Sequence, residues 1–328
     1  MSEAIISVRD LSVRYKTKES TVYATEHVSF DLERGKVLAL IGESGAGKTT
    51  AGMSILRLLP PEAEILSGEV WFDGQDLVHM EEKHLRTIRG RRIAMIFQDP
   101  VAGLNPVVTI GNQVAEMLTS HLDIGKKEAK AQARQILFDV GLSDPDRVAK
   151  SYPFQLSGGM CQRVMIGIAT ALNPDVIIAD EPTSALDVTI QAQILYQINM
   201  LREHRGTAVL LITHSFGVVA QLADEVAVMY GGRIVEVGDV VPMMKAPLHP
   251  YTHALLATLP RVDGLREHLA AIPGNPPELT APNEHCPFLP RCTKAMNICR
   301  TDPAPPLVTD DVRTHPVACY NPVWQTTD

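Results

Sequence analysis

The first third of the chain alternates apolar and polar positions, a spacing that predicts strands with one buried face. The alternation runs through residues 6–8, 11–13 and 28–32. Residues 36–41 are mostly apolar and predict a buried strand that runs into a glycine-rich loop, and the apolar positions after Lys48 predict a buried helix. We therefore expect half-buried strands and then a strand, a loop and a helix.

The middle of the chain changes to helical spacing. Residues 126–140 predict a helix, and a glycine stands just past its end, where glycine is common. Strand patterns at residues 93–97 and 176–180 flank this region. Residues 99–172 are therefore expected to form a helical insertion between strands, with another helix that begins near Ser157.

Strand patterns return at residues 208–213 and 225–230, and a Gly-Gly pair then predicts a hairpin into residues 233–237. Strands that alternate with helices imply a largely parallel α/β core. Residues 246–328 are rich in proline, which disfavours long helices and central strands. We expect this part to be an irregular extension with one short helix near residues 251–259.

A phosphate-binding loop is the first motif that carries chemistry. It runs Gly42-Glu43-Ser44-Gly45-Ala46-Gly47-Lys48-Thr49 and stands between a predicted strand and a predicted helix. Glycines in such a loop let backbone N–H groups turn towards phosphate oxygens. Lys48 is expected to reach the β- and γ-phosphates, and Thr49 to offer its hydroxyl to Mg²⁺.

A second glycine pair follows a serine far along the chain, in Ser157-Gly158-Gly159. One nucleotide is not readily held by two such surfaces of a single subunit, so the pair indicates a dimer with ATP between two copies of the fold. Asp180 ends an apolar strand, where a carboxylate can hold Mg²⁺ through water. Glu181 follows it and is suited to act as the base for the attacking water.

These motifs, in this order, resemble the ATP-binding subunit of an ABC transporter over about residues 5–245. The resemblance implies an α/β P-loop NTPase core with an antiparallel β subdomain and a helical insertion. It also implies that residues 156–162 are the signature motif, which meets the γ-phosphate of the ATP bound to the partner subunit. Gln98 resembles the glutamine that contacts Mg²⁺ or the lytic water, and His214 the switch histidine.

The same resemblance implies a full set of nucleotide contacts. Asp187 belongs to a loop that spans the dimer interface, and Tyr15 stands where an aromatic ring stacks on adenine, with Tyr23 as a competitor. Catalysis is assigned to Glu181, His214 and Gln98, and Mg²⁺ to Thr49, Gln98 and Asp180. The nucleotide-contacting set is Tyr15, Gly42, Ser44, Gly45, Gly47, Lys48, Thr49, Thr50, Gln98, Ser157, Gly158, Gly159, Asp180 and Asp187.

Shorter motifs narrow the resemblance to the ATPase subunits of oligopeptide, dipeptide and nickel importers, and most closely to the peptide branch. They are residues 97–100, 104–106, 249–252 and 272–274. The implied domains are an ATP-binding domain at 1–245 and a transporter-type extension at 246–328. The implied assembly has two membrane permease subunits, a second ATPase subunit of different sequence and an extracytoplasmic peptide-binding protein. A nickel or other small-solute importer is the alternative.

Composition excludes little but agrees with this reading. The chain has 328 residues and a net charge of −8, from 30 basic and 38 acidic residues, which argues against a nucleic-acid binder. No apolar run approaches the roughly 20 residues of a membrane span, and the N-terminus lacks a signal-peptide pattern. We expect a peripheral protein on the cytoplasmic face of the cell membrane. A soluble ABC ATPase that acts on nucleic acid or ribosomes is the alternative of a different class.

Four cysteines near the C-terminus form a second chemical feature: Cys286, Cys292, Cys299 and Cys319. In a reducing compartment such clustering favours a metal over disulfides. The pattern has three interpretations: a tetrahedral Zn²⁺ site, a [4Fe–4S] cluster, or four unligated thiols. The spacing lacks the paired C-x-x-C of structural zinc sites and favours the bulkier cluster, which the resemblance to the peptide importers also implies. Cys161 is interpreted as a small buried helix residue.

Overall fold

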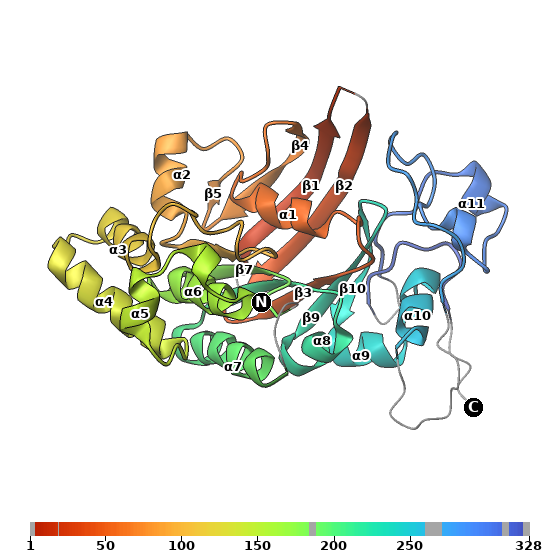
Figure 1. The fold of residues 1–328 in the computed structure, drawn as a ribbon. Coiled ribbons are helices and arrows are strands. Elements are labelled where there is room, and N and C mark those ends of the chain that lie inside the picture. Colours follow the sequence, from red (N-terminus) through yellow and green to blue (C-terminus); the bar gives the residue numbers. More distant parts are fainter. Residues whose placement is uncertain (1–3, 19, 184–187, 260–270, 310–314, 324–328) are drawn as a thin grey trace. The chain divides into compact units, whose positions relative to one another are not determined.

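The structure is a computed structural model, and it describes residues 4–18, 20–183, 188–259, 271–309 and 315–323 (Figure 1). The chain divides into two compact units. One, built mainly from His79–Leu211, is called the helical unit below. The other combines Ile6–Asp31, Val37–Val78 and Ile212–Asp328 and is called the phosphate-loop unit.

The helical unit contains parallel strands whose residues are all buried. β6 (Ile93–Ile96) pairs with β7 (Val176–Asp180) in parallel, with Ile96 opposite Ala179. β8 (Ala208–Ile212) is the other neighbour of β7. Parallel strands that are covered on both faces consist of continuous apolar residues, and this pattern made these strands predictable.

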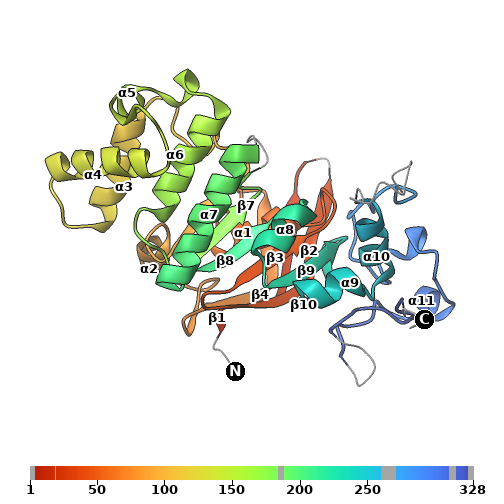
Figure 2. The ribbon, with the colours of Figure 1, turned by 90° about the horizontal axis from the view of Figure 1, so that it is seen from below.

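Four helices lie between β6 and β7 along the chain, and they group together in Figure 2. They are α3 (Ile110–His121), α4 (Lys126–Asp139), α5 (Pro145–Lys150) and α6 (Gly158–Thr170). Their apolar faces form one buried cluster that includes Ile110, Val114, Leu137 and Val164. The helix expected at 126–140 is therefore confirmed. The unit also holds α2 (Glu82–Ile88) and α7 (Val188–Arg205).

The phosphate-loop unit begins with an antiparallel sheet in the order β2-β1-β4-β5. Its strands are β1 (Ala4–Lys16), β2 (Thr21–Glu33), β4 (Ala63–Phe72) and β5 (Gln75–Asp76). In the pairing of β1 with β4, Ile6 lies opposite Phe72 and Tyr15 opposite Ala63. The strands predicted from alternating positions are present, and they form the antiparallel β subdomain that the family resemblance implies.

A second group of strands in this unit carries the phosphate loop. β3 (Val37–Ile41) pairs in parallel with β9 (Glu225–Tyr230), and β9 pairs antiparallel with β10 (Arg233–Asp239). Gly231 and Gly232 have φ values of 54° and 80°, the left-handed region that a tight hairpin turn needs. The predicted hairpin is confirmed. Helices α1 (Lys48–Ile55), α8 (Phe216–Leu222) and α9 (Val240–Lys245) complete this part.

The C-terminal extension packs on these strands. It contains α10 (Pro250–Ala257), the 3₁₀ turn Leu289–Arg291 and α11 (Ile298–Thr301), so the one helix expected near 251–259 is present and a shorter one was missed. The ring of Phe288 lies 5.2 Å from that of Tyr230 and 5.4 Å from that of Tyr251, centre to centre. Aromatic pairs at such distances add to the stabilisation from burial alone.

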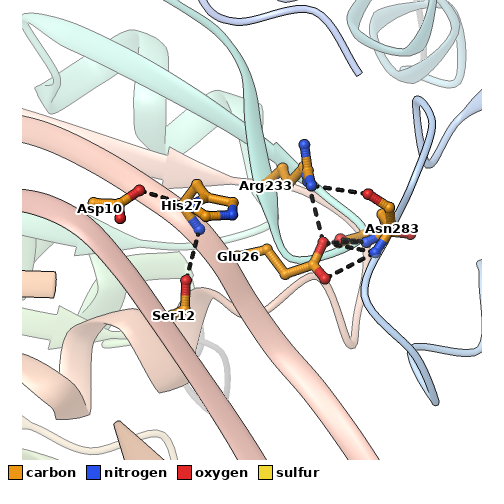
Figure 3. Close-up of polar contacts among 7 residues, drawn as sticks. Asp10, Ser12, Glu26, His27, Arg233 and Asn283 are labelled. Atoms are coloured by element: carbon orange, nitrogen blue, oxygen red, sulfur yellow. Dashed lines mark hydrogen bonds and ion pairs between the residues drawn. The ribbon is translucent and has the colours of Figure 1, made fainter. Parts of the chain in front are cut away.

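A buried carboxylate also fastens the extension to the β strands, as Figure 3 shows. Glu26 of β2 accepts hydrogen bonds from Arg233 Nε at 3.1 Å and from the Asn283 side-chain amide at 2.7 Å. The backbone N–H of Asn283 donates to the same carboxylate at 2.9 Å. The buried charge is thereby paired and hydrogen-bonded, as a carboxylate away from water must be.

Candidate functional site

The phosphate loop has the backbone that its glycines predict. Gly42, Gly45 and Gly47 have φ values of 153°, 81° and 97°. A Cβ at Gly42 would overlap the carbonyl oxygen of Met229, and one at Gly47 would overlap that of Ala24. Close packing behind the loop therefore requires glycine at both positions. Lys48 Nζ donates to the carbonyls of Gly42 at 2.8 Å and Glu43 at 2.9 Å, so its ammonium lies across the loop.

The first turn of α1 carries the remaining predicted contacts of this unit. Thr49 is exposed, and so is Ser44 in the loop, which suits groups that meet a ligand. Thr50 is buried, and its Oγ1 lies 3.1 Å from the hydroxyl of Tyr15. Tyr15 therefore lies beside the start of the helix that follows the phosphate loop. The backbone N–H of Tyr23, the competitor, donates instead to the carbonyl of Leu279 at 2.7 Å.

The predicted acids lie at the carboxyl end of β7. Asp180 and Glu181 are both buried, with exposed fractions of 2% and 9%. Glu181 has φ of 48°, which is uncommon for a residue with a side chain and is typical of functional sites. Gln98 is exposed just past the end of the neighbouring strand β6. The helical unit thus brings Gln98 and the two acids to the same edge of its parallel strands.

Gln162 is a site residue that sequence reasoning did not assign a role. It lies on α6, is buried, and its side-chain amide donates to the carbonyl of Pro182 at 2.8 Å. This bond joins α6, the helix that begins within the signature motif, to the turn that follows Glu181. The sequence contained a signal, since Gln162 ends the signature motif, but the bonding partner lies 20 residues away and no local pattern identifies it.

The signature motif begins α6. Ser157 is the N-cap residue, and its Oγ accepts from the Met160 N–H at 3.3 Å. Its neighbour Gly158 is exposed and Gly159 half-buried, so backbone N–H groups at the positive end of a 13-residue helix face outward. An open cavity beside them is lined by Ser157, Gly159, Arg147 and Arg163, among others. Such a surface is chemically suited to phosphate.

His214 and Asp187 are the two remaining predicted residues. His214 is exposed just past β8, in the phosphate-loop unit. Asp187 falls outside the described residues. Within the helical unit the structure holds Gln98, Ser157, Gly158, Gly159, Asp180 and Glu181, and within the phosphate-loop unit Tyr15, the phosphate loop, Lys48, Thr49, Thr50 and His214.

The four C-terminal cysteines line one cavity, together with Phe288 and other residues of the extension. Burial raises the pKa of Cys286 to about 11 and that of Cys319 to about 12, and it also raises the pKa of Cys292. Among the described residues, however, no three His, Cys, Asp or Glu side chains are arranged so that they could hold a metal ion. The predicted [4Fe–4S] cluster is therefore not supported by the side-chain geometry, although the four cysteines line the same cavity.

Cys161 behaves as expected of a buried helix residue. It is fully buried in α6, and burial raises its pKa. Among the helices that the structure describes, none has the length and apolar character to cross a membrane.

Comparison with known proteins identifies the class. Residues 25–184 match the ABC transporter family. A solved structure of a dimeric ATP-binding cassette, bound to ADP and Pi in a post-hydrolysis state, is 28% identical with a TM-score of 0.65 and matches 72% of this chain and 98% of that one. The fold and the phosphate loop thus define an ATPase of the ABC type, which hydrolyses ATP, and the predicted fold class is confirmed.

The extension narrows the class to one family. Residues 235–299 match the oligopeptide/dipeptide transporter C-terminal region. The dipeptide transport ATP-binding protein DppD of Bacillus subtilis (strain 168) is 45% identical over 97% of this chain and 95% of its own length. The oligopeptide transport ATP-binding protein OppD of Escherichia coli (strain K12) is 40% identical over 98% and 94%. The chain belongs to the family of ATP-binding subunits of oligopeptide and dipeptide ABC transporters.

Proposed function

We propose that this chain is the ATP-hydrolysing motor subunit of an importer that takes up dipeptides or oligopeptides. One observation carries the proposal: a single chain joins an intact phosphate loop to an extension that matches the oligopeptide/dipeptide transporters. DppD and OppD, similar over nearly the whole chain, are named for dipeptide and oligopeptide transport.

The phosphate loop binds the triphosphate of ATP. Backbone N–H groups of the loop and of the first turn of α1 face the phosphate oxygens, and Lys48, held across the loop by the carbonyls of Gly42 and Glu43, reaches the β- and γ-phosphates. Tyr15 lies beside this turn and stacks on adenine. Thr49, Asp180 and Gln98 are the residues that would hold Mg²⁺, which would neutralise part of the charge on the phosphates.

Hydrolysis depends on the residue that follows Asp180. Glu181 accepts a proton from the attacking water, and its backbone has the left-handed φ of 48°. The bond from Gln162 to Pro182 stabilises this turn. Gln98 orients the water, and His214 donates a hydrogen bond to the γ-phosphate.

The signature surface serves the ATP of a partner subunit. Ser157, Gly158 and Gly159 present hydroxyl and backbone N–H groups at the start of α6, where the helix dipole favours an anion. Asp187 contributes to the same dimer interface. ATP binding therefore closes a dimer, formed with a second ATPase subunit of different sequence, and hydrolysis reopens it.

The rest of the assembly follows from this role. The helices between β6 and β7 pass the motion of the dimer to two membrane permease subunits. An extracytoplasmic binding protein delivers the peptide to them. The chain therefore works as a peripheral subunit on the cytoplasmic face of the cell membrane.

Replacing Lys48 with Ala is expected to abolish ATP-driven peptide uptake, because the loop loses the cation that faces the phosphates. The measurement is uptake of a radiolabelled dipeptide and a pentapeptide by cells that carry the complete transporter. Lys127→Ala, on the exposed side of α4, is the control and should retain uptake. Uptake of Ni²⁺ without uptake of either peptide would contradict the proposed substrate class.

We also propose that Cys286, Cys292, Cys299 and Cys319 are the ligands of a [4Fe–4S] cluster. Two facts support this: the four thiols line one cavity, and the segment that carries the first three of them matches the transporter family. Because no three described side chains are arranged to hold a metal ion, the thiols would have to turn inwards when the cluster binds. Thiols with raised pKa values remain protonated in the absence of a cation, so metal binding would have to displace their protons. When bound, the cluster would crosslink residues 286–319 of an extension with little regular structure.

Anaerobic purification is expected to yield roughly four iron and four sulfide ions per chain, with a broad absorption near the visible range. Cys292→Ser should lower both metal content and absorption, because one ligand is lost. Cys161→Ser changes a buried cysteine of the helical unit and should alter neither. Stoichiometric zinc, or equal iron in the Cys292→Ser chain, would refute the assignment.

A further inference from the structure

The side chain of Arg291, in the extension, is buried, and all three nitrogens of its guanidinium donate hydrogen bonds. Only 5% of its side chain is exposed. Nη1 lies 2.7 Å from Oε2 of Glu43 and Nη2 lies 3.1 Å from Oε1, a two-pronged ion pair. Nη1 also donates to the Tyr230 hydroxyl, Nη2 to the Ile272 carbonyl and Nε to the Pro273 carbonyl. Five bonds match the five N–H donors of a guanidinium, so its orientation is fixed.

Glu43 is the second residue of the phosphate loop. Its carbonyl accepts from Lys48 Nζ at 2.9 Å, and its backbone N–H donates to the Tyr251 hydroxyl at 2.9 Å. The side chain of Glu43 is held by Arg291, so one residue of the loop is fixed at three points. The ion pair therefore acts on the residue whose carbonyl orients Lys48.

The partner of Glu43 comes from a segment 248 residues away in the chain. Arg291 ends the turn Leu289–Arg291 and directly precedes Cys292. Its N–H donates to the Phe288 carbonyl at 2.9 Å, and Phe288 packs on Tyr230 and Tyr251. The conformation of the segment between Cys286 and Cys292 therefore decides where the guanidinium lies.

Charge gives a second reason for this pairing. A carboxylate within a phosphate loop repels an incoming triphosphate, and with Arg291 bound the pair is neutral overall. A two-pronged guanidinium also fixes geometry in a way that the point charge of a lysine does not. An unpaired, partly buried carboxylate would both repel ATP and move towards water.

We propose that Arg291 is a positioning residue for the phosphate loop: by holding Glu43, it makes ATP affinity depend on a correctly folded C-terminal extension. This goes beyond the motor function proposed above and rests on it for the role of the loop. Arg291 contacts no substrate atom; it acts through Glu43 and through the carbonyl that orients Lys48.

The test is the affinity of the full-length chain for Mg-ATP, measured by displacement of trinitrophenyl-ATP. Arg291→Met is expected to raise the dissociation constant about tenfold or more, and Arg291→Lys to recover part of the loss. In the assembled transporter, KM for ATP should rise while kcat stays near its parental value, because Glu181 and Gln98 are untouched. A general loss of folding would lower kcat through the fraction of active protein.

A double-substitution cycle separates coupling from independent damage. Glu43→Gln alone removes the ion pair and the repulsive carboxylate together, so it should weaken binding less than Arg291→Met does. Glu43→Gln with Arg291→Met should be no weaker than Arg291→Met alone, since both remove one interaction. Multiplied losses would overturn the proposal. So would unchanged affinity in an Arg291→Met chain with a parental circular-dichroism spectrum.

Asn283→Ala is the matched control. It removes another bond between the extension and the strands, the amide that donates to Glu26 in Figure 3, without contact to Glu43. Affinity should stay within about twofold of the parental chain, well under the tenfold change that a broken buried ion pair produces. An equal loss in Asn283→Ala would show that any loosening of the extension weakens binding.

Lys48→Ala tests the loop itself: parental affinity in that chain would refute the proposed nucleotide role rather than the role of Arg291.

Discussion

Replacing Glu181 with Gln is expected to lower ATP hydrolysis by on the order of 10²- to 10⁴-fold while ATP remains bound. The amide has nearly the shape of the carboxylate but cannot accept the proton of the attacking water. Neither the φ of 48° at this position nor the bond from the Gln162 side chain to the Pro182 carbonyl involves the Glu181 side chain, so both should survive the substitution. The variant should therefore accumulate as a closed, ATP-bound dimer.

The measurement is single-turnover hydrolysis by the assembled transporter, with the corresponding glutamate of the second ATPase subunit also replaced. Hydrolysis at the partner's site then adds nothing to the signal. Glu203→Gln changes an exposed glutamate of α7. In a transporter whose second subunit also lacks its glutamate, this control should hydrolyse ATP as fast as the chain that keeps Glu181. A transporter with Glu181→Gln that keeps the same rate would contradict the proposed base, whatever its ATP affinity.

Buried strands and capped helices were the parts of the fold that could be predicted from local pattern. β7 and β9 have the predicted bounds because each is a run of mostly apolar residues that ends at a polar residue or a glycine turn. Residues 188–194, by contrast, alternate apolar and polar positions as a strand would, yet they begin the 18-residue helix α7. Tertiary packing decided between two readings that the local spacing left open.

The site shows the same division. Spacing alone identified Lys48, Thr49, Glu181 and the signature, because each motif is a short stretch of chain whose backbone shape depends on its own residues. The long-range contacts that hold those residues in place were not predicted. The bond from Arg291 to Glu43 joins residues 248 positions apart, and no periodicity connects them. The extension looked like an appendage in the sequence, and the structure places one of its side chains against the phosphate loop.

The packing behind the glycines of the loop also comes from residues outside the local motif. We expect Gly47→Ala to abolish detectable ATP binding and to destabilise the chain by on the order of 3 kcal/mol. Gly47 has φ of 97°, and a Cβ there would overlap the carbonyl oxygen of Ala24 on β2. The loop or the strand must move, and either movement displaces the N–H groups that face the phosphates.

Gly45→Ala separates this overlap from backbone strain. Gly45 has φ of 81°, but a Cβ there meets no atom within 4 Å, so only the strain of about 1–2 kcal/mol remains. Urea unfolding of both variants without nucleotide should therefore give a clearly lower midpoint for Gly47→Ala than for Gly45→Ala. Equal midpoints would mean that conformational strain alone explains these glycines. A lower midpoint only at Gly47 would show that β2, which carries no phosphate-binding motif, fixes the shape of the loop from behind.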